Sequence, residues 1–98
     1  MINREQLDVI DTIVENLDVN VSKICKSGEV KKTTFYAWLR KKSFLEELNS
    51  RMLEHINGLT IDQINEEYKR SSDFRFRFFY AALKERKDIK FHHGFVSN

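Results

Sequence analysis

Proline is absent from this 98-residue chain, which also has only three glycines and one cysteine. Proline and glycine are the residues that most often end helices and form turns. Their scarcity therefore favours helices over a turn-rich sheet fold. The single Cys25 excludes an intramolecular disulfide and a zinc site with several cysteine ligands, and it fits a reducing, intracellular setting.

No apolar run reaches the roughly 18–20 residues of a membrane span. The first ten residues, MINREQLDVI, are acidic and amphipathic, unlike a secretion signal. We therefore expect a cytoplasmic protein without a membrane partner. Phosphate loops, His-Glu zinc motifs and nucleophile elbows are also missing, so we expect no enzyme and no cofactor. His92 and His93 are adjacent, but a metal site needs more ligands at suitable spacing.

Apolar residues make up 41% of the chain and aromatic residues 12%, which is enough for one modest core. We expect one domain over residues 1–98. The charges are segregated along the chain, with net −4 over 1–20, +6 over 21–42, −5 over 43–68 and +5 over 69–98. This pattern indicates a basic surface built from two distant segments, with ordinary solvated faces as the alternative.

The spacing of apolar residues in the first half predicts an all-α fold. Positions 7, 10, 13, 14 and 17 form the stripe of an amphipathic helix over residues 4–17, with Asn3 as its N-cap. After a polar break, a short helix is expected over 21–27, ended by Gly28. The next helix is expected over residues 32–41.

The second half predicts two or three further helices. Ser43 and the glutamate three residues later fit a capping box at the start of a fourth helix. Its expected apolar stripe consists of Phe44, Leu45, Leu48, Met52 and Ile56. Asn57-Gly58 favours a stop, and Thr60 fits a second capping box that opens a helix over 61–70. One unbroken helix over 43–70 is the alternative.

The stretch FRFRFFY, residues 74–80, has an ambiguous pattern. Phenylalanine alternates with arginine as in a strand, but Ser72-Asp73 is a good helix start and YAALKERK is strongly helical. We predict a helix whose aromatic side chains lie in the core. Alternatively, these aromatics form a subunit interface, or a platform with Arg75 and Arg77 that stacks single-stranded bases. The tail IKFHHGFVSN is expected to be irregular.

The segment VKKTTFYAWLRKK, residues 30–42, combines large apolar residues with a polar, basic face. On a helix with about 100° per residue, Phe35, Trp38 and Leu39 cluster on one side. The opposite side keeps a small residue, Ala37, where a bulky one would hold the helix away from DNA bases. Together with the short helix before it, this segment predicts a helix-turn-helix unit over residues 4–42 that binds double-stranded DNA.

The residues expected to contact DNA lie on and around this helix. The candidates for base edges are Thr33, Thr34, Ala37 and Arg40. The candidates for the phosphate backbone are Lys23, Lys26, Lys31, Lys32, Tyr36, Lys41 and Lys42. Cys25 is expected at the small buried position where the two helices touch, and Val30 is expected to fill the turn. An amphipathic helix with a solvated basic face is the alternative.

The stretch NVSKICKSGEVKKTTFYAWLRKKSFLEEL resembles the homeodomain-like helix-turn-helix of phage terminase small subunits and related insertion-element transposases. The residues that carry the resemblance are Val30, Tyr36, Trp38-Leu39 and Phe44. The stretch SDFRFRFFYAALKERKDIKF is similar to a second block of this family. The family's turn glycine aligns with Glu29, so either the turn holds an extra residue or Glu29 adopts an unfavourable backbone angle.

The resemblance implies a homo-oligomer that recognises phage DNA for packaging, with residues 43–91 used for packing or oligomerisation. It also implies a large terminase subunit or another phage protein as a possible partner. A transcriptional regulator of phage or mobile-element origin is the first alternative. The second alternative, from another class, is a protein-interaction adaptor on a helix-turn-helix scaffold.

Overall fold

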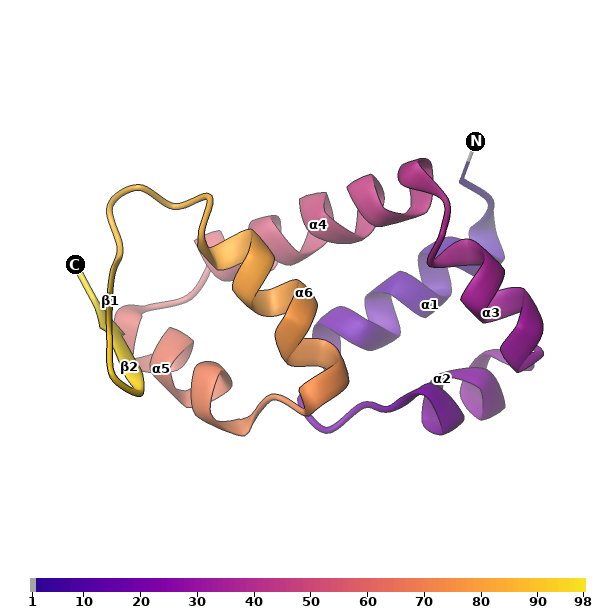
Figure 1. Cartoon of the computed structure of the whole chain (residues 1–98), viewed down its shortest axis with the longest axis horizontal. Coiled ribbons are helices and arrows are strands. Elements are labelled where there is room, and N and C mark those ends of the chain that lie inside the picture. Colours follow the sequence, from indigo (N-terminus) through magenta and orange to yellow (C-terminus); the bar gives the residue numbers. More distant parts are fainter. Residues whose placement is uncertain (1) are drawn as a thin grey trace.

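The computed structural model describes residues 2–98, and in this part of the chain six helices precede one antiparallel hairpin. The helices are α1 (Arg4–Glu15), α2 (Val21–Gly28), α3 (Lys32–Trp38), α4 (Lys42–Asn57), α5 (Ile61–Arg70) and α6 (Asp73–Leu83). The strands are β1 (Lys90–His92) and β2 (Phe95–Ser97). The predicted all-α class is therefore confirmed, with three helices following α1–α3. Figure 1 places α2 and α3 at one end of the long axis and the hairpin at the other.

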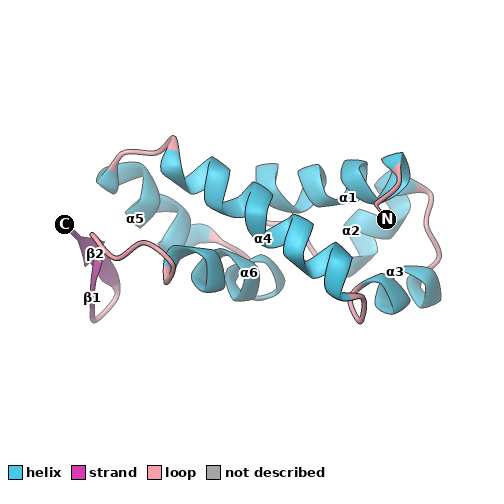
Figure 2. Ribbon diagram, turned by 90° about the horizontal axis from the view of Figure 1, so that it is seen from above, coloured by secondary structure: helices cyan, strands magenta, loops and turns pink. Residues whose placement is uncertain are grey.

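Helix α4 is the central element of the fold. It runs along α1 on one side and α6 on the other, as Figures 1 and 2 show from two directions. Its buried residues are Phe44, Leu48, Met52 and Ile56. This spacing of four places them in one stripe that both neighbours cover. Leu45, which we expected in the same stripe, is instead 37% exposed.

Side-chain caps set most of the helix starts. Asn3 forms a capping box with Gln6, and Thr60 forms one with Gln63, as its sequence pattern predicted. α4 ends at Asn57 and α5 begins after Thr60, so the unbroken helix over 43–70 is wrong. The predicted cap at Ser43 is also wrong, because the N-cap position of α4 is Lys41, two residues earlier, and it has no side-chain cap.

The turn between α2 and α3 contains the only non-glycine residue with a positive φ in the described part of the chain. Glu29 has φ 53°, and Gly28 is the last residue of α2. Glu29 thus adopts the unfavourable angle that the sequence analysis gave as one of two possibilities. A Cβ at Gly28 would lie 3.3 Å from Val9 Cγ2, so this glycine permits close packing of α2 on α1. Cys25 and Val30 are buried as predicted.

The tail is not irregular, as we had expected, but forms the β1–β2 hairpin. Phe91 pairs with Val96 in its register, and Gly94 with φ 80° supplies the turn. The Asn65 side chain of α5 donates to the Val96 carbonyl at 2.9 Å and accepts from the Val96 N–H at 2.6 Å. A side-chain amide therefore holds β2 much as a third strand would.

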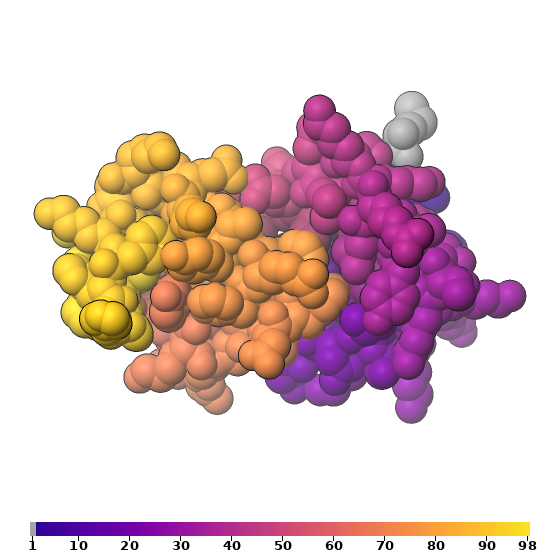
Figure 3. All heavy atoms as spheres, viewed as in Figure 1, coloured from indigo at the N-terminus to yellow at the C-terminus, as the bar shows by residue number. Residues whose placement is uncertain are grey.

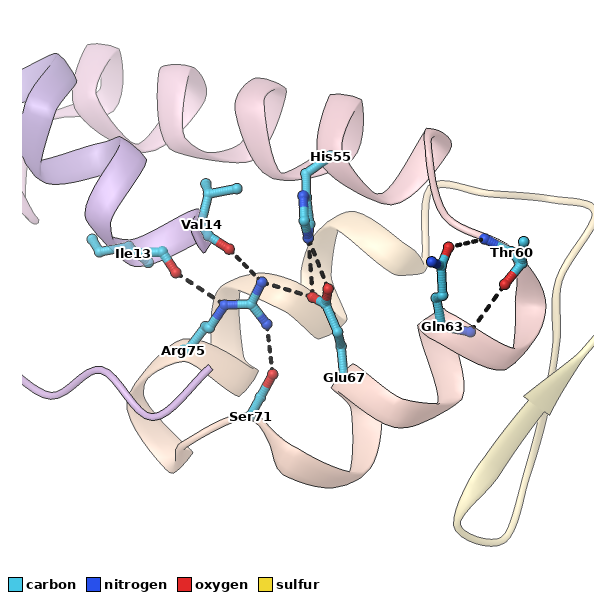
Figure 4. Close-up of polar contacts among 8 residues, drawn as sticks. All are labelled: Ile13, Val14, His55, Thr60, Gln63, Glu67, Ser71 and Arg75. Carbon is cyan, nitrogen blue, oxygen red and sulfur yellow. Dashed lines mark hydrogen bonds and ion pairs between the residues drawn. The ribbon is translucent and has the colours of Figure 1, made fainter. Parts of the chain in front are cut away.

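Helix α6 begins after the Ser72 cap, as predicted, and it carries a buried arginine. The Arg75 side chain has no exposure. Its guanidinium donates to the backbone carbonyls of Ile13 and Val14, to Ser71 Oγ and to Glu67, as drawn in Figure 4. Arg75 therefore belongs to the interior and cannot join a base-stacking platform. Among the aromatics of α6, Phe79 is fully buried and the others are half-buried.

Candidate nucleic-acid interface

Helix α3 is held in place by its inner side. Phe35 is fully buried and Trp38 is 7% exposed. Both rings pack on Phe44 of α4, with ring centroids 6.4 Å and 5.9 Å away, respectively. Burial of a large apolar side chain contributes roughly 1.5–3 kcal/mol. These contacts therefore fix which face of α3 points outward, and that face agrees with the predicted helical phase.

The outer side of α3 carries the residues that the sequence singled out. Thr33, Thr34, Tyr36 and Ala37 are all exposed. In Figure 3 the side chains of α2 and α3, coloured purple to magenta, project from the end of the molecule that lies opposite the hairpin. The outer face of α3 therefore presents two threonine hydroxyls, the phenol ring of a tyrosine and one small residue.

The expected helix over 32–41 is three residues too long. α3 ends at Trp38, and Arg40 lies in the following turn, where its N–H donates to the Ala37 carbonyl at 3.2 Å. The physical reason is that Lys41 has an extended backbone that starts α4 and brings Phe44 under α3. Arg40 is exposed and lines an open pocket together with Lys42, beyond the last residue of α3.

The lysines predicted to contact the DNA backbone are all exposed, but they differ in their partners. Lys23 donates to Asp18 over 2.9 Å, and this hydrogen bond and the lysine charge lower the pKa of the Asp18 carboxyl. Lys42 lies 3.9 Å from Glu46. Among the described residues, the candidates without an ion pair are Lys26, Lys31, Lys32, Arg40 and Lys41. These five cations are therefore available to an anionic ligand.

The length of α3 limits the number of base pairs that it can contact. Seven residues at 1.5 Å per residue give a helix of roughly 10 Å. An α-helix with its side chains is about 10–12 Å across and fits the major groove, which is about 12 Å wide. Successive base pairs are about 3.4 Å apart, so the length of α3 covers roughly three base pairs. A single copy therefore presents a short reading surface.

Two exposed aromatics that the sequence analysis did not assign lie at the other end of the molecule. Phe91 is 38% exposed and Phe95 is 48% exposed, one on each strand of the hairpin. Each strand is only three residues long, which gave the sequence analysis too little pattern to recognise it.

Two further features concern ligands and membranes. In the described residues, no three His, Cys, Asp or Glu side chains form a group that could hold a metal ion. None of the helices in residues 2–98 combines the length and apolar character needed to cross a bilayer.

Comparisons of the chain with protein-family models, with curated proteins and with solved structures found no match. The likeness to phage terminase small subunits therefore stays a prediction that rests on the residues quoted for it.

Proposed function

We propose that the chain binds double-stranded DNA by placing α3 in the major groove. The observation that carries this proposal is the division of α3 into two sides. Phe35 and Trp38 anchor the helix in the core, while its outer side exposes small and hydroxyl-bearing residues. A helix that only packed against the core would not need five unpaired cations between residues 26 and 41.

Each part of this surface has a physical role in the proposal. The hydroxyls of Thr33 and Thr34 bond to base edges, and the methyl group of Ala37 contacts thymine. The five unpaired cations contact phosphates and fix the register of the helix on the duplex. If all five neutralise a phosphate, the plot of log affinity against log salt has a slope of about −4.5, at about −0.9 per phosphate.

The short reading surface of α3 favours more than one copy on the DNA, because roughly three base pairs give little discrimination. We therefore propose a homo-oligomer with repeated or symmetric half-sites. Combined with the resemblance, the proposed role is recognition of phage DNA for packaging, in the cytoplasm of a bacterial host. A large terminase subunit is the partner that this role requires.

The experiment is selection of bound sequences from a random duplex DNA pool, with affinity followed across salt. We expect an enriched short motif and a steep salt slope. Lys32→Ala should reduce the steepness of the slope by about one unit, whereas Lys69→Ala, an exposed lysine on α5, should leave the slope unchanged. Absence of binding at low salt would contradict the proposal and leave a protein-interaction adaptor.

The mass of the protein in solution separates packaging from regulation. A ring of many copies supports packaging, since such a subunit must surround or organise DNA. A dimer that binds one palindromic motif supports a transcriptional regulator that uses the same helix. Mass photometry with and without the enriched duplex distinguishes the two outcomes.

A further inference from the structure

A second surface lies at the end of the molecule opposite α3, around the hairpin (Figure 1). The residues that line one open pocket there, the hairpin pocket, are Tyr68, Tyr80, Phe91, His92, His93 and Phe95. They come from α5, α6 and both strands, so tertiary packing brings them together. The pocket volume of about 650 Å³ falls within the roughly 300–1,000 Å³ of ligand sites.

The exposed rings of this pocket are not required by the hydrophobic core. The hairpin segment reaches the core through Ile89 and Val96, which are 6% and 1% exposed. Phe91 and Phe95 remain 38% and 48% exposed, although burying a phenylalanine is favourable. Together with Tyr36 and Leu45 they are the exposed large hydrophobic residues of the described chain. Both rings line the hairpin pocket, Phe91 from the hairpin face that carries Val96 and Phe95 from the face that carries His92.

The rings are also held in fixed orientations. Phe95 stacks on His92 with centroids 4.7 Å apart and planes at 15°, and His92 Nε2 lies 2.8 Å from Ser97 Oγ. Phe91 packs edge-on against Tyr80 at 5.4 Å. A planar ligand would therefore meet ordered ring faces and lose little side-chain freedom on binding.

The lining of the pocket contains no lysine or arginine, but one unpaired cation, Lys84, lies beside it. The Lys84 ammonium lies 5.4 Å from the centre of the Tyr80 ring. Among the described residues, Lys84, Lys87 and Lys90 are exposed and form no ion pair. No carboxylate lines the pocket. Aromatic faces beside unpaired cations match the two parts of a nucleotide, its base and its phosphate.

We infer that the hairpin pocket binds single-stranded nucleic acid, with bases stacked on Phe95 and Phe91 and phosphates near Lys84. Ring faces accept unpaired bases of any sequence, whereas the bases of a duplex are already stacked on each other. A second copy of the chain fits less well, because a symmetric contact would bring the same lysines against each other. This site is separate from α3 and does not depend on the proposed duplex binding.

The test is fluorescence anisotropy of the full chain with labelled oligo-dT and oligo-U. Phe95→Ala should weaken binding at least about fivefold, the change that corresponds to about 1 kcal/mol of base stacking. Phe95→Trp should preserve the affinity, since it keeps an aromatic face. Leu45→Ala is the matched control, because Leu45 is a similarly exposed apolar residue outside the pocket. Melting temperatures establish that the variants are folded.

The outcomes separate the possible ligands. The inference is supported if either oligonucleotide binds and Phe95→Ala binds more weakly than the parent and Phe95→Trp. Tighter binding of oligo-dT identifies DNA as the ligand, and tighter binding of oligo-U identifies RNA. Unchanged affinity in Phe95→Ala, or no binding at about 50 mM salt, overturns it. Sedimentation velocity shows whether Phe95→Ala instead dissociates a dimer, which would assign the pocket to a second copy. Lys32→Ala should retain single-strand binding, so failure at α3 and failure at this pocket are distinguishable.

Discussion

The Arg75 guanidinium donates to the Glu67 carboxylate over 2.8 Å at a point where the Arg75 side chain is fully buried. It also donates to the carbonyls of Ile13 and Val14, which belong to the last turn of α1. The last carbonyls of a helix have no partner within the helix, so Arg75 satisfies two of them. Glu67 is shared with His55 of α4, whose Nε2 lies 3.0 Å away (Figure 4).

Removal of the Arg75 guanidinium should cost a large part of the stability of the fold. Arg75→Met removes one of the two partners of the Glu67 carboxylate and the donor to two helix carbonyls, and we expect a loss of about 3–5 kcal/mol. Arg77→Met is the control, because Arg77 is exposed and forms no ion pair among the described residues, with its guanidinium over the Phe74 and Phe78 rings. Urea unfolding followed by circular dichroism measures both. Equal effects would contradict the structural role of Arg75.

The Glu67 carboxylate should make stability depend on acid pH. Burial would raise the pKa of Glu67, but hydrogen bonds from His55 and Arg75 and their charges outweigh it and lower that pKa. A lowered pKa in the folded state stabilises the fold above the unfolded value of about 4.5, and this contribution disappears as pH falls through the folded value. Glu67→Gln should therefore be less stable than the parent at pH 7.

The difference in stability between the parent and Glu67→Gln, measured from urea unfolding midpoints, should become smaller as the pH is lowered toward about 3. Glu66→Gln is the control, because Glu66 forms an exposed pair with Arg70 that contributes little. A difference between parent and Glu67→Gln that stays constant with pH would show that the carboxylate charge does not stabilise the fold.

Substitution of Trp38 should affect folding, whereas substitution of Tyr36 should affect DNA binding. Trp38→Ala creates a cavity beside Phe44, and we expect a loss of about 3–5 kcal/mol. Tyr36→Ala changes an exposed ring and should alter stability by less than about 0.5 kcal/mol while weakening DNA binding. Thermal unfolding and duplex titration test the pair. A stable Trp38→Ala protein would mean that the helical phase of α3 is wrong.

Arg40 should behave as a phosphate contact because it lies beyond the end of α3. Arg40→Ala is expected to weaken binding to all duplexes alike and to reduce the steepness of the salt slope by about one unit. Thr34→Val keeps the shape of a side chain on α3 and should change the preferred sequence instead. Loss of discrimination of about 1–3 kcal/mol in Arg40→Ala would instead show that it reads a guanine.

The left-handed Glu29 gives a prediction about the helix-turn-helix turn. A side chain in this conformation costs roughly 1–2 kcal/mol, and glycine avoids that cost but has a more flexible unfolded chain. Glu29→Gly should therefore raise stability by up to about 1 kcal/mol. Glu29→Asn should give a smaller gain, and Glu29→Ala none. Melting temperatures test this order, and a gain for alanine would show that the backbone angle is not the cause.

The sequence predicted those parts of the fold that depend on local chemistry. Helix starts with a side-chain cap, such as Asn3 and Thr60, and the buried side of α3 follow from residue type and spacing alone. Ser43 was misassigned because packing of Phe44 under α3 moved the helix start and the end of α3 together. Local propensity is weak against such tertiary contacts.

The role of Arg75 could not be predicted, because the two helix carbonyls that it bonds lie about sixty residues away in the sequence. In FRFRFFY the two arginines look equivalent, yet Arg75 points into the core and Arg77 to solvent. The hairpin was missed for a related reason. Its position depends on Asn65 of α5, and three-residue strands carry too little pattern to be recognised.

The link from α6 to the end of α1 makes the first half of the chain depend on the second. Ser72 adds to it, since its N–H donates to the Leu17 carbonyl and its hydroxyl to the Val19 carbonyl. The start of α6 therefore holds the connection between α1 and α2 in place through hydrogen bonds. Residues 4–42 would lose these hydrogen bonds if they were excised or grafted onto another protein. Hydrogen exchange should therefore show that the amides of both halves open together, as one cooperative unit.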